Sequence, residues 1–289
     1  MLADLVSIFV SFDDFCKQFE KEITDRQIGN KSESSLSISE IGTILIAFHL
    51  SDYRHFKHFY LEHVSKYLVN DFPCLVSYNR FVELIPNSLI YLIYFLNRHC
   101  KGECTGISFI DSTSLKVCHN KRIPSNKVFQ GLATQGKTSV DWFFGFKLHL
   151  IINDRGEILS CQFTPGNVDD RVPVKNMSKK LTGYLFGDKG YIKQELFEEL
   201  YEQGLKLITK IKKNMKNSLI PMFEKVMLRK RAIVESVNDF LKNICQIEHS
   251  RHRSPVNAFV NMVSALIAYS FLPKKPSLNL SDFPSIASF

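Results

Sequence analysis

One stretch of the chain, residues 142–152, alternates so regularly between apolar and other side chains that it restricts the possible folds. The apolar face carries Trp142, Phe144, Phe146, Leu148, Leu150 and Ile152, and the other face carries Lys147 and His149. A period of two predicts a β-strand with one face in the core. The turn Asn153–Gly156 and the segment Glu157–Phe163 extend this strand into a β-hairpin.

Further elements are predicted before and after the hairpin along the chain. A short apolar strand, Gly106–Ile110, comes before it. The elements after it are a helix over about 170–181, a strand Tyr184–Gly187, a helix Ile192–Gln203, a strand Leu205–Ile211, a long helix Leu228–Cys245 and an apolar helix Asn257–Leu272. This order is typical of an α/β ribonuclease-H-like fold, in which helices flank a mixed five-stranded sheet.

The sequence pattern of the first hundred residues predicts helices and no strands. Ser37 and Glu40 form a capping box ahead of a helix Ile38–Leu50, and Ser77 can cap a helix Tyr78–Leu96 that bends at Pro86. These helices fit either a DNA-binding helix-turn-helix or a plain bundle that dimerises. We therefore expect a helical domain over 1–100, an α/β domain over 101–275 and a tail over 276–289.

The positive charge of the chain is concentrated in one segment. The whole chain carries +8, and residues 206–231 alone hold nine basic side chains and one acidic one. The basic residues of this segment include Lys210, Lys212, Lys213, Arg229 and Lys230. Such a strip either is a solvated loop or neutralises the phosphates of a nucleic acid, and we favour the second interpretation.

Membrane and secretory classes receive no support from the sequence. No apolar run reaches the roughly 18 residues that a membrane helix needs, and the N-terminal residues do not resemble a signal peptide. The seven cysteines are then expected to be reduced thiols in the cytoplasm. Cys100, Cys104, Cys118 and His119 could be considered for a zinc site, but their spacing fits no standard one.

Two predicted strands end in an aspartate, Asp111 and Asp188. In the predicted fold these two strands are adjacent and parallel, which would bring both carboxylates to the same end of the sheet. Carboxylates so close repel each other unless a cation lies between them. Oxygen ligands favour Mg²⁺, with Mn²⁺ as a substitute.

A third carboxylate, Glu235, lies on the predicted long helix. Arg231, Glu235 and Lys242 fall within about 40° of one another at 100° per residue, so they form one polar stripe. Three carboxylates can hold two divalent ions for phosphoryl transfer. Arg231 and Lys242 could then pair with the flanking phosphates of DNA.

These motifs resemble the DDE transposases of bacterial insertion sequences, especially the family named after insertion sequence nine-eighty-two. The matching segments are Phe109–Ser112, Gly187–Tyr191 and the Arg231, Glu235 and Lys242 spacing, with further likeness at 142–150, 164–171 and 77–81. Related families have a tyrosine where this chain has Leu228.

The resemblance implies DNA transposition. Asp111, Asp188 and Glu235 would be the catalytic metal ligands, and the enzyme would cleave the ends of its element and join the 3′-hydroxyls to target DNA. It would act on double-stranded DNA as a homodimer. A structure-selective nuclease on the same fold and a catalytically inactive DNA-binding regulator remain the alternatives.

Overall fold

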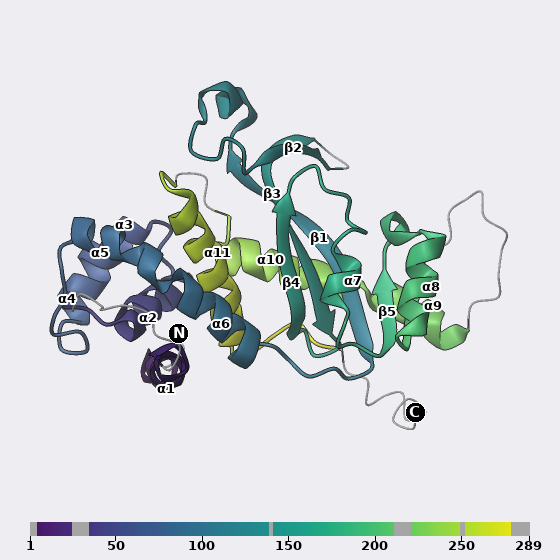
Figure 1. Ribbon diagram of the computed structural model, residues 1–289, viewed down its shortest axis with the longest axis horizontal. Helices are drawn as coiled ribbons and strands as arrows, with labels where there is room; N and C mark the ends of the chain where they lie inside the picture. The colour runs from purple at the N-terminus through teal and green to yellow at the C-terminus, as the bar shows by residue number, and fades with distance from the viewer. Residues whose placement is uncertain (1–4, 25–34, 139–140, 211–220, 249–251, 279–289) are drawn as a thin grey trace. The chain divides into compact units, whose positions relative to one another are not determined.

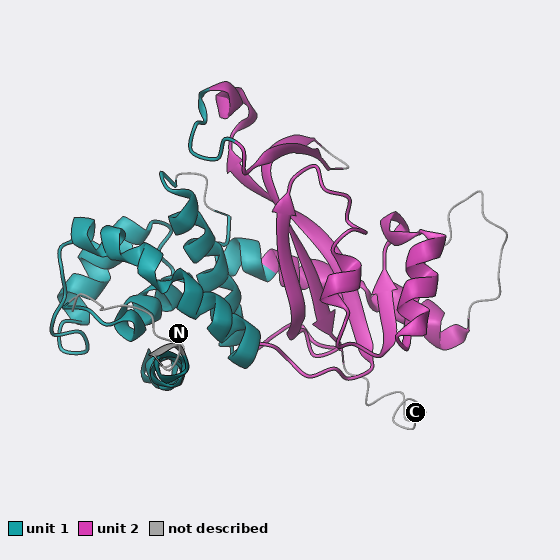
Figure 2. Ribbon diagram, in the orientation of Figure 1, with its two compact units in different colours: residues 1–100, 125–130, 240–273 teal, residues 101–124, 131–239, 274–289 magenta. Residues whose placement is uncertain are grey.

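The computed structural model describes residues 5–24, 35–138, 141–210, 221–248 and 252–278 (Figure 1). The chain divides into two compact units (Figure 2). Unit 1 comprises residues 1–100, 125–130 and 240–273, and unit 2 comprises residues 101–124, 131–239 and 274–289. Within the described residues, no helix is both long and apolar enough to cross a membrane.

Unit 1 is built from helices. They are α1 (Leu5–Thr24), α2 (Ile38–His49), α3 (Phe56–Phe59) with the π-turn η1 (Tyr60–Val64) and α4 (Ser65–Tyr67), α5 (Tyr78–Leu84), the 3₁₀ turn η2 (Ile85–Ser88), α6 (Leu89–His99), the π-turn η5 (Phe240–Ile244) and α11 (Pro255–Ser270). The capping box of Ser37 and Glu40 is present, and Ser77 caps α5 as predicted. Pro86 lies in η2, which interrupts the predicted helix at the expected place.

The first segment of unit 1 ends at Cys100, where the sequence-based division falls, but unit 1 also contains residues 125–130 and 240–273. Helix α11 packs against α2 and α6, and therefore belongs to unit 1 rather than to the α/β domain. The reason lies in its composition: α11 buries Val260, Leu266 and Ile267 completely. A helix that is apolar on most of its surface needs helical neighbours on several sides.

The helix-turn-helix interpretation remains a prediction. The connection between α4 and α5 runs over residues 68–77, longer than the three- to four-residue turn of that motif. Arg80, in the first turn of α5, forms an ion pair with Glu83 at 2.8 Å.

Unit 2 contains a six-stranded mixed sheet. Its strands are β1 (Ile107–Cys118), β2 (Thr134–Lys137), β3 (Trp142–Asn153), β4 (Ile158–Pro165), β5 (Gly183–Gly187) and β6 (Leu205–Thr209). The order is β2-β3-β1-β5-β6, and β4 also pairs with β3. Strands β1 and β5 are parallel neighbours, as predicted, with Phe109 opposite Phe186.

Two expectations about the strands need correction. Strand β1 continues to Cys118 instead of ending before Asp111, because Ser112, Thr113 and Ser114 pair along β3. Strand β2 is an additional strand that lies between the two predicted strands at 106–110 and 142–152. The sheet of this unit therefore has six strands rather than five.

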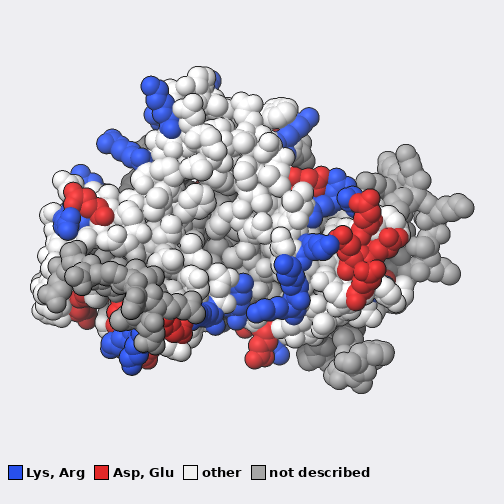
Figure 3. Space-filling model, viewed as in Figure 1, with Lys and Arg blue, Asp and Glu red and all other residues white. Residues whose placement is uncertain are grey.

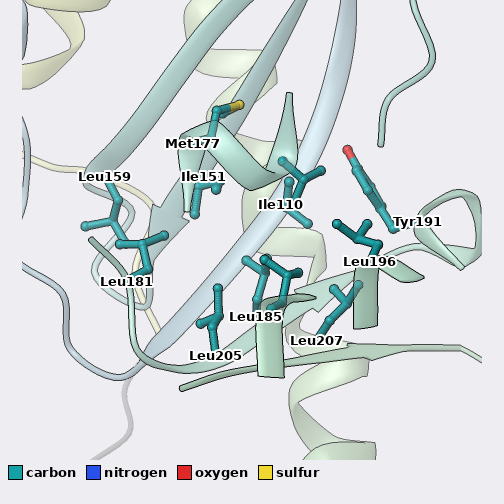
Figure 4. Close-up of a cluster of buried hydrophobic side chains, with 12 residues drawn as sticks. Ile110, Ile151, Leu159, Met177, Leu181, Leu185, Tyr191, Leu196, Leu205 and Leu207 are labelled. Carbon is teal, nitrogen blue, oxygen red and sulfur yellow. The ribbon is translucent and has the colours of Figure 1, made fainter. Parts of the chain in front are cut away.

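Helices cover both faces of this sheet. On one face α7 (Val174–Met177) and α8 (Gln194–Glu202) share a buried cluster with β1, β3, β5 and β6, shown in Figure 4. On the other face α9 (Met222–Lys230) packs Phe223 against Phe186, and α10 (Ala232–Asp239) contacts β1. Residue 111 points toward this second face, because its neighbour Ile110 belongs to the first cluster.

The structure divides the predicted long helix Leu228–Cys245 into three segments. Helix α9 ends at Lys230, α10 starts at Ala232, and η5 follows from Phe240 to Ile244. A π-turn holds more residues per turn than an α-helix, so the 100° spacing stops applying there. Consistent with this change, Ile244 is exposed, although a continuous α-helix would place it on the same side as the buried Val237 and Leu241.

Candidate active site

Asp111 is a half-buried carboxylate in the middle of β1, opposite Leu150 of β3, and its side chain is 23% exposed. It lies just beyond the last pair that β1 forms with β5. The guanidinium Nη1 of Arg231 lies 3.5 Å from its Oδ1, and Nδ2 of Asn238 donates a hydrogen bond of 3.2 Å to its Oδ2. Both partners come from the segment that starts α10 and runs along β1, so helix and strand together define this position.

The electrostatic environment of Asp111 is unfavourable for its charge. Burial raises the pKa of Asp111 to about 6, and the nearby Arg231 opposes that rise. The carboxylates of Asp188 and Glu235 raise the pKa further. The three predicted carboxylates are therefore close enough to interact, all within unit 2.

Asp188 follows the last residue of β5. It is exposed, and its Oδ1 accepts a hydrogen bond of 2.6 Å from the backbone of Gly190. This bond caps the short 3₁₀ turn Lys189–Tyr191. A Cβ at Gly190 would lie 2.9 Å from the same oxygen, so the glycine leaves space for the carboxylate.

Glu235 is an exposed residue of α10 that contacts Arg231 one turn earlier. Nη2 of Arg231 lies 2.5 Å from Oε1 of Glu235, and the side chain of Arg231 is only 15% exposed. One guanidinium therefore stands between Asp111 and Glu235 and partly balances both charges. Arg231 and Glu235 are four residues apart on one side of the helix, and the structure brings them into contact.

The donor chemistry of the site fits a hard divalent cation, but the arrangement is not a closed coordination shell. Within the described residues, no three His, Cys, Asp or Glu side chains are close enough to share a metal ion. Arg231 Nη1 and Asn238 Oδ1, which are beside Asp111, are buried without a hydrogen-bond partner in this part of the chain. These unsatisfied atoms and the all-carboxylate set fit a site that takes up further polar groups.

Asn238 is a site residue that the sequence-based reasoning missed. It follows Arg231 by seven residues, which puts it on the same side of an α-helix. The seven-residue spacing from Arg231 could have identified Asn238 as a site residue. Its side chain is a neutral amide, however, and the prediction considered only charged side chains.

Lys242 lies in the π-turn η5, within unit 1, and its Nζ is 3.7 Å from Glu248. A π-turn holds more residues per turn than an α-helix, so the 100° spacing that predicted one stripe with Arg231 and Glu235 does not extend to Lys242. Its contact with DNA stays a prediction.

The basic strip is described only in part. Lys210, Arg229 and Lys230 are exposed, whereas Lys212 and Lys213 lie outside the described residues. Lys206, at the start of the strip, lies 2.5 Å from Glu224, which is the single acidic residue of the segment. Leu228, at the position of the family tyrosine, is buried in the core.

Lys147 and His149 do not lie on an open strand face. His149 is completely buried, and Lys147 donates hydrogen bonds to Val168 O and to Asp170 Oδ1. Burial lowers the pKa of His149 to about 4, so its imidazole is neutral near pH 7. These residues lie on the face of the sheet opposite to Asp111.

The helix α8 carries a concentration of negative charge. Figure 3 shows acidic side chains gathered over this helix. The exposed residues are Glu195, Glu198, Glu199 and Glu202. Phosphates would be repelled from this surface, which leaves the side of α9 and α10 as the better approach to the carboxylates.

The raised pKa of Asp111 predicts a gain in stability when its charge is removed. The folded chain holds this proton more tightly than the unfolded chain, so ionisation destabilises the fold as pH rises through about 6. In buffer with a chelator, Asp111→Asn should raise the free energy of unfolding by up to about 3 kcal/mol at pH 8 and by much less at pH 4.

Urea unfolding at the two pH values measures this difference. Glu202→Gln, which removes an exposed carboxylate from α8, should change little at either pH. Equal effects of Asp111→Asn at pH 4 and pH 8 would contradict the assignment of a destabilising buried charge.

Comparison with known proteins agrees with this arrangement. Residues 101–255, more than half of the chain, match the family described as "Transposase DDE domain". The piggyBac transposase, in a synaptic complex with hairpin DNA, has a similar structure with a TM-score of 0.51. The identity is 13%, and the match covers 92% of this chain and 74% of that one. No curated protein matches the chain. The mixed sheet, its flanking helices and above all the family match lead to one conclusion: the chain belongs to the DDE-domain transposases.

Proposed function

We propose that the chain is the transposase of a bacterial insertion sequence. It would cleave the ends of its element with Mg²⁺, or with Mn²⁺ as a substitute, and join the free 3′-hydroxyls to target DNA. We place this reaction in the cytoplasm, on two element ends held by a homodimer. The sheet order and the position of α10 support a ribonuclease-H-like catalytic domain.

One observation carries the proposal: a half-buried carboxylate, Asp111, interacts with two others, Asp188 and Glu235, in a domain of the transposase family. A structural core rarely retains an ionised carboxylate whose pKa is raised by burial and by like charges. Such perturbed groups concentrate at functional sites. The cost of burying Asp111 is therefore best explained by the chemistry that it performs.

The three carboxylates have different surroundings, and we assign their roles accordingly. Asp111 is fixed between β1 and α10, Asp188 is held by its own turn, and Glu235 is exposed and bonded to Arg231. All three would hold Mg²⁺, which supplies an activated oxygen nucleophile and stabilises the leaving oxygen. Glu235 would complete this ligand set in place of its bond to Arg231.

Arg231 then becomes available for the substrate. Its guanidinium can form two parallel hydrogen bonds to a phosphate. In the free chain it donates a hydrogen bond to Glu235 and forms an ion pair with Asp111. We propose that Arg231 holds a DNA phosphate beside the reacting bond. Lys210, Arg229 and Lys230, with Lys212 and Lys213, would extend the contact along the backbone.

A nuclease and an inactive regulator are the competing functions. A nuclease would hydrolyse DNA without joining 3′ ends, and a regulator would bind DNA without cleaving it. Both share the fold, so only the products of the reaction separate them.

Loss of a single carboxylate should abolish catalysis without unfolding the chain. We expect Asp188→Asn and Glu235→Gln each to slow cleavage and joining by roughly a thousandfold or more. Both residues are exposed, so the unfolding temperature should change little. The assay uses DNA that carries the terminal inverted repeats flanking the reading frame, with Glu198→Gln on α8 as control.

The products of this assay also test the alternatives. Hydrolysis without joined 3′ ends would support the nuclease, and binding without cleavage would support the regulator. If Glu235→Gln retained full activity, the assignment of the third carboxylate would be wrong.

The basic strip should contribute phosphate contacts. The double variant Arg229→Ala with Lys230→Ala should weaken DNA binding and reduce the slope of log affinity against log salt by about 2, because two counterion-releasing contacts are lost. Fluorescence anisotropy over a range of salt concentrations measures this slope. Lys179→Ala with Lys180→Ala, a pair of exposed lysines after α7, is the matched control. An unchanged slope in the first variant would mean that this part of the strip is only a solvated surface.

A further inference from the structure

Trp142, the first residue of β3, departs from the pattern of its own strand. The apolar residues that follow on the same face of β3, from Phe144 to Ile152, are buried, whereas Trp142 is 55% exposed. We infer that Trp142 and the basic residues beside it form a binding surface for an unpaired strand of DNA, with a base stacked on the indole ring. The inference rests on the proposed function in taking DNA as the substrate, and it adds a surface separate from the basic strip of residues 206–231.

The chain between the middle of β1 and the start of β3 is strongly basic. Residues 112–140 hold five Lys and Arg side chains and no Asp or Glu. Lys and Arg side chains, blue in Figure 3, project from the region where Figure 1 places β2 and the turn before it. The members of this group that belong to unit 2 are all exposed, namely Lys116, Lys121, Arg122 and Lys137. Such a segment can replace the counterions of a nucleic-acid backbone.

The hairpin of β2 and β3 brings one of these cations onto the indole ring. Lys137 lies directly opposite Trp142 in the antiparallel register, so the two side chains share one face of the hairpin. Lys137 Nζ lies 5.7 Å from the centre of the ring, within the range of a cation–π contact. A nucleotide whose base stacks on this ring would therefore have a cation within reach of its phosphate.

A short turn attaches two further cations to the start of β3. The 3₁₀ turn η3 (Asn120–Ser125) begins with a side chain whose Nδ2 donates a hydrogen bond of 2.8 Å to Trp142 O. Lys121 and Arg122 follow this anchor directly and are exposed. The Trp142 surface is thus defined by four residues of unit 2, which are Trp142, Lys137, Lys121 and Arg122.

Only one face of the hairpin is covered near this surface. A Cβ at Gly136 would lie 2.2 Å from Gly166 O, so the segment after β4 packs against the face opposite to Trp142. Phe143 is on that covered face and is buried. Asp141, the acid next to Trp142, directs Oδ1 to the backbone, where it accepts a hydrogen bond of 2.7 Å from Trp142 N. The other face therefore presents the ring together with Lys137.

The Trp142 surface and Asp111 are on the same face of the sheet. Leu150 lies opposite Asp111, and eight residues separate it from Trp142, so the period of two puts all three side chains on one side. Eight residues of a strand span at most about 27 Å, the length of about eight stacked nucleotides at 3.4 Å each. A DNA strand that leaves the carboxylates along this face would reach the Trp142 surface.

The exposed ring favours an unpaired strand over a duplex. In a duplex the bases stack on one another, and their faces are not accessible to a side chain. An unpaired base can stack on an exposed aromatic ring, and this contact is largely independent of sequence. Cations alone would suit either form of DNA, so Trp142 is the residue that discriminates between them.

Fluorescence of Trp142 tests the inference directly, because it is the only tryptophan in the sequence. The full chain is titrated in buffer with a chelator, which prevents cleavage, with a single-stranded oligonucleotide or with the duplex of the same sequence. We expect the single strand to quench the fluorescence and the duplex to change it little. Fluorescence anisotropy of labelled DNA measures binding of each form under the same conditions.

Variants separate stacking from charge. Trp142→Ala should weaken binding of the single strand about tenfold, because one stacked base is lost, and should affect the duplex little. Lys137→Ala should reduce the slope of log affinity against log salt by about 0.7, the value for one phosphate contact on a single strand. Tyr201→Ala, which removes a 73% exposed aromatic ring from α8, is the matched control and should bind both forms like the wild-type chain.

Three results would overturn the inference. They are a single strand that binds without changing the fluorescence, an equal loss for single strand and duplex in Trp142→Ala, and the same loss in Tyr201→Ala. Thermal unfolding shows whether Trp142→Ala retains the fold, and if it does not, the fluorescence of the wild-type chain decides.

The same titrations distinguish this inference from the proposed function. If the wild-type chain bound neither form of DNA, the proposed function would itself be wrong. If it bound the duplex, and the single strand left the fluorescence unchanged, only the role of the Trp142 surface would be lost.

Discussion

The contact between Asp111 and Arg231 is the interaction on which the site depends. Burial makes the charge of Asp111 costly, and the guanidinium 3.5 Å away is the cation that offsets part of this cost. The same guanidinium contacts Glu235. The free chain therefore holds its carboxylates together with an internal cation, and binding of a metal would replace this cation and release Arg231 for a phosphate.

Two features of the fold bring the residues of this contact together. Parallel pairing of β1 with β5 brings the two aspartates to neighbouring strands, and α10 lies along β1 so that Arg231 and Asn238 reach Asp111. The opposite face of the sheet is filled by an apolar cluster that ends at Tyr191. Each carboxylate of the proposed site is thus attached to a packed element, which limits its movement in a manner suited to preorganised chemistry.

Much of this arrangement could be predicted from the sequence, because it depends on local patterns. Alternation located β3, and the spacing of Arg231 and Glu235 gave a true contact. The failures have physical causes. The polar run Ser112–Ser114 looks like the end of a strand, yet its backbone pairs with β3. A π-turn after Asp239 ends the regular helical spacing before Lys242, and α11 packs with helices that are distant in sequence. Tertiary packing determines the length of β1, the π-turn and the position of α11, and local sequence propensity does not reveal it.

The central claim is that Asp111, Asp188 and Glu235 surround a divalent cation that displaces Arg231. The most direct measurement is an anomalous difference map from crystals of the full chain grown with Mn²⁺ and a DNA end. The account predicts a peak within coordination distance of Asp111 and Asp188, with Glu235 turned toward it and Arg231 on a phosphate. A map with no peak at these carboxylates, or a metal bound while Arg231 still bridges Asp111 and Glu235, would contradict it.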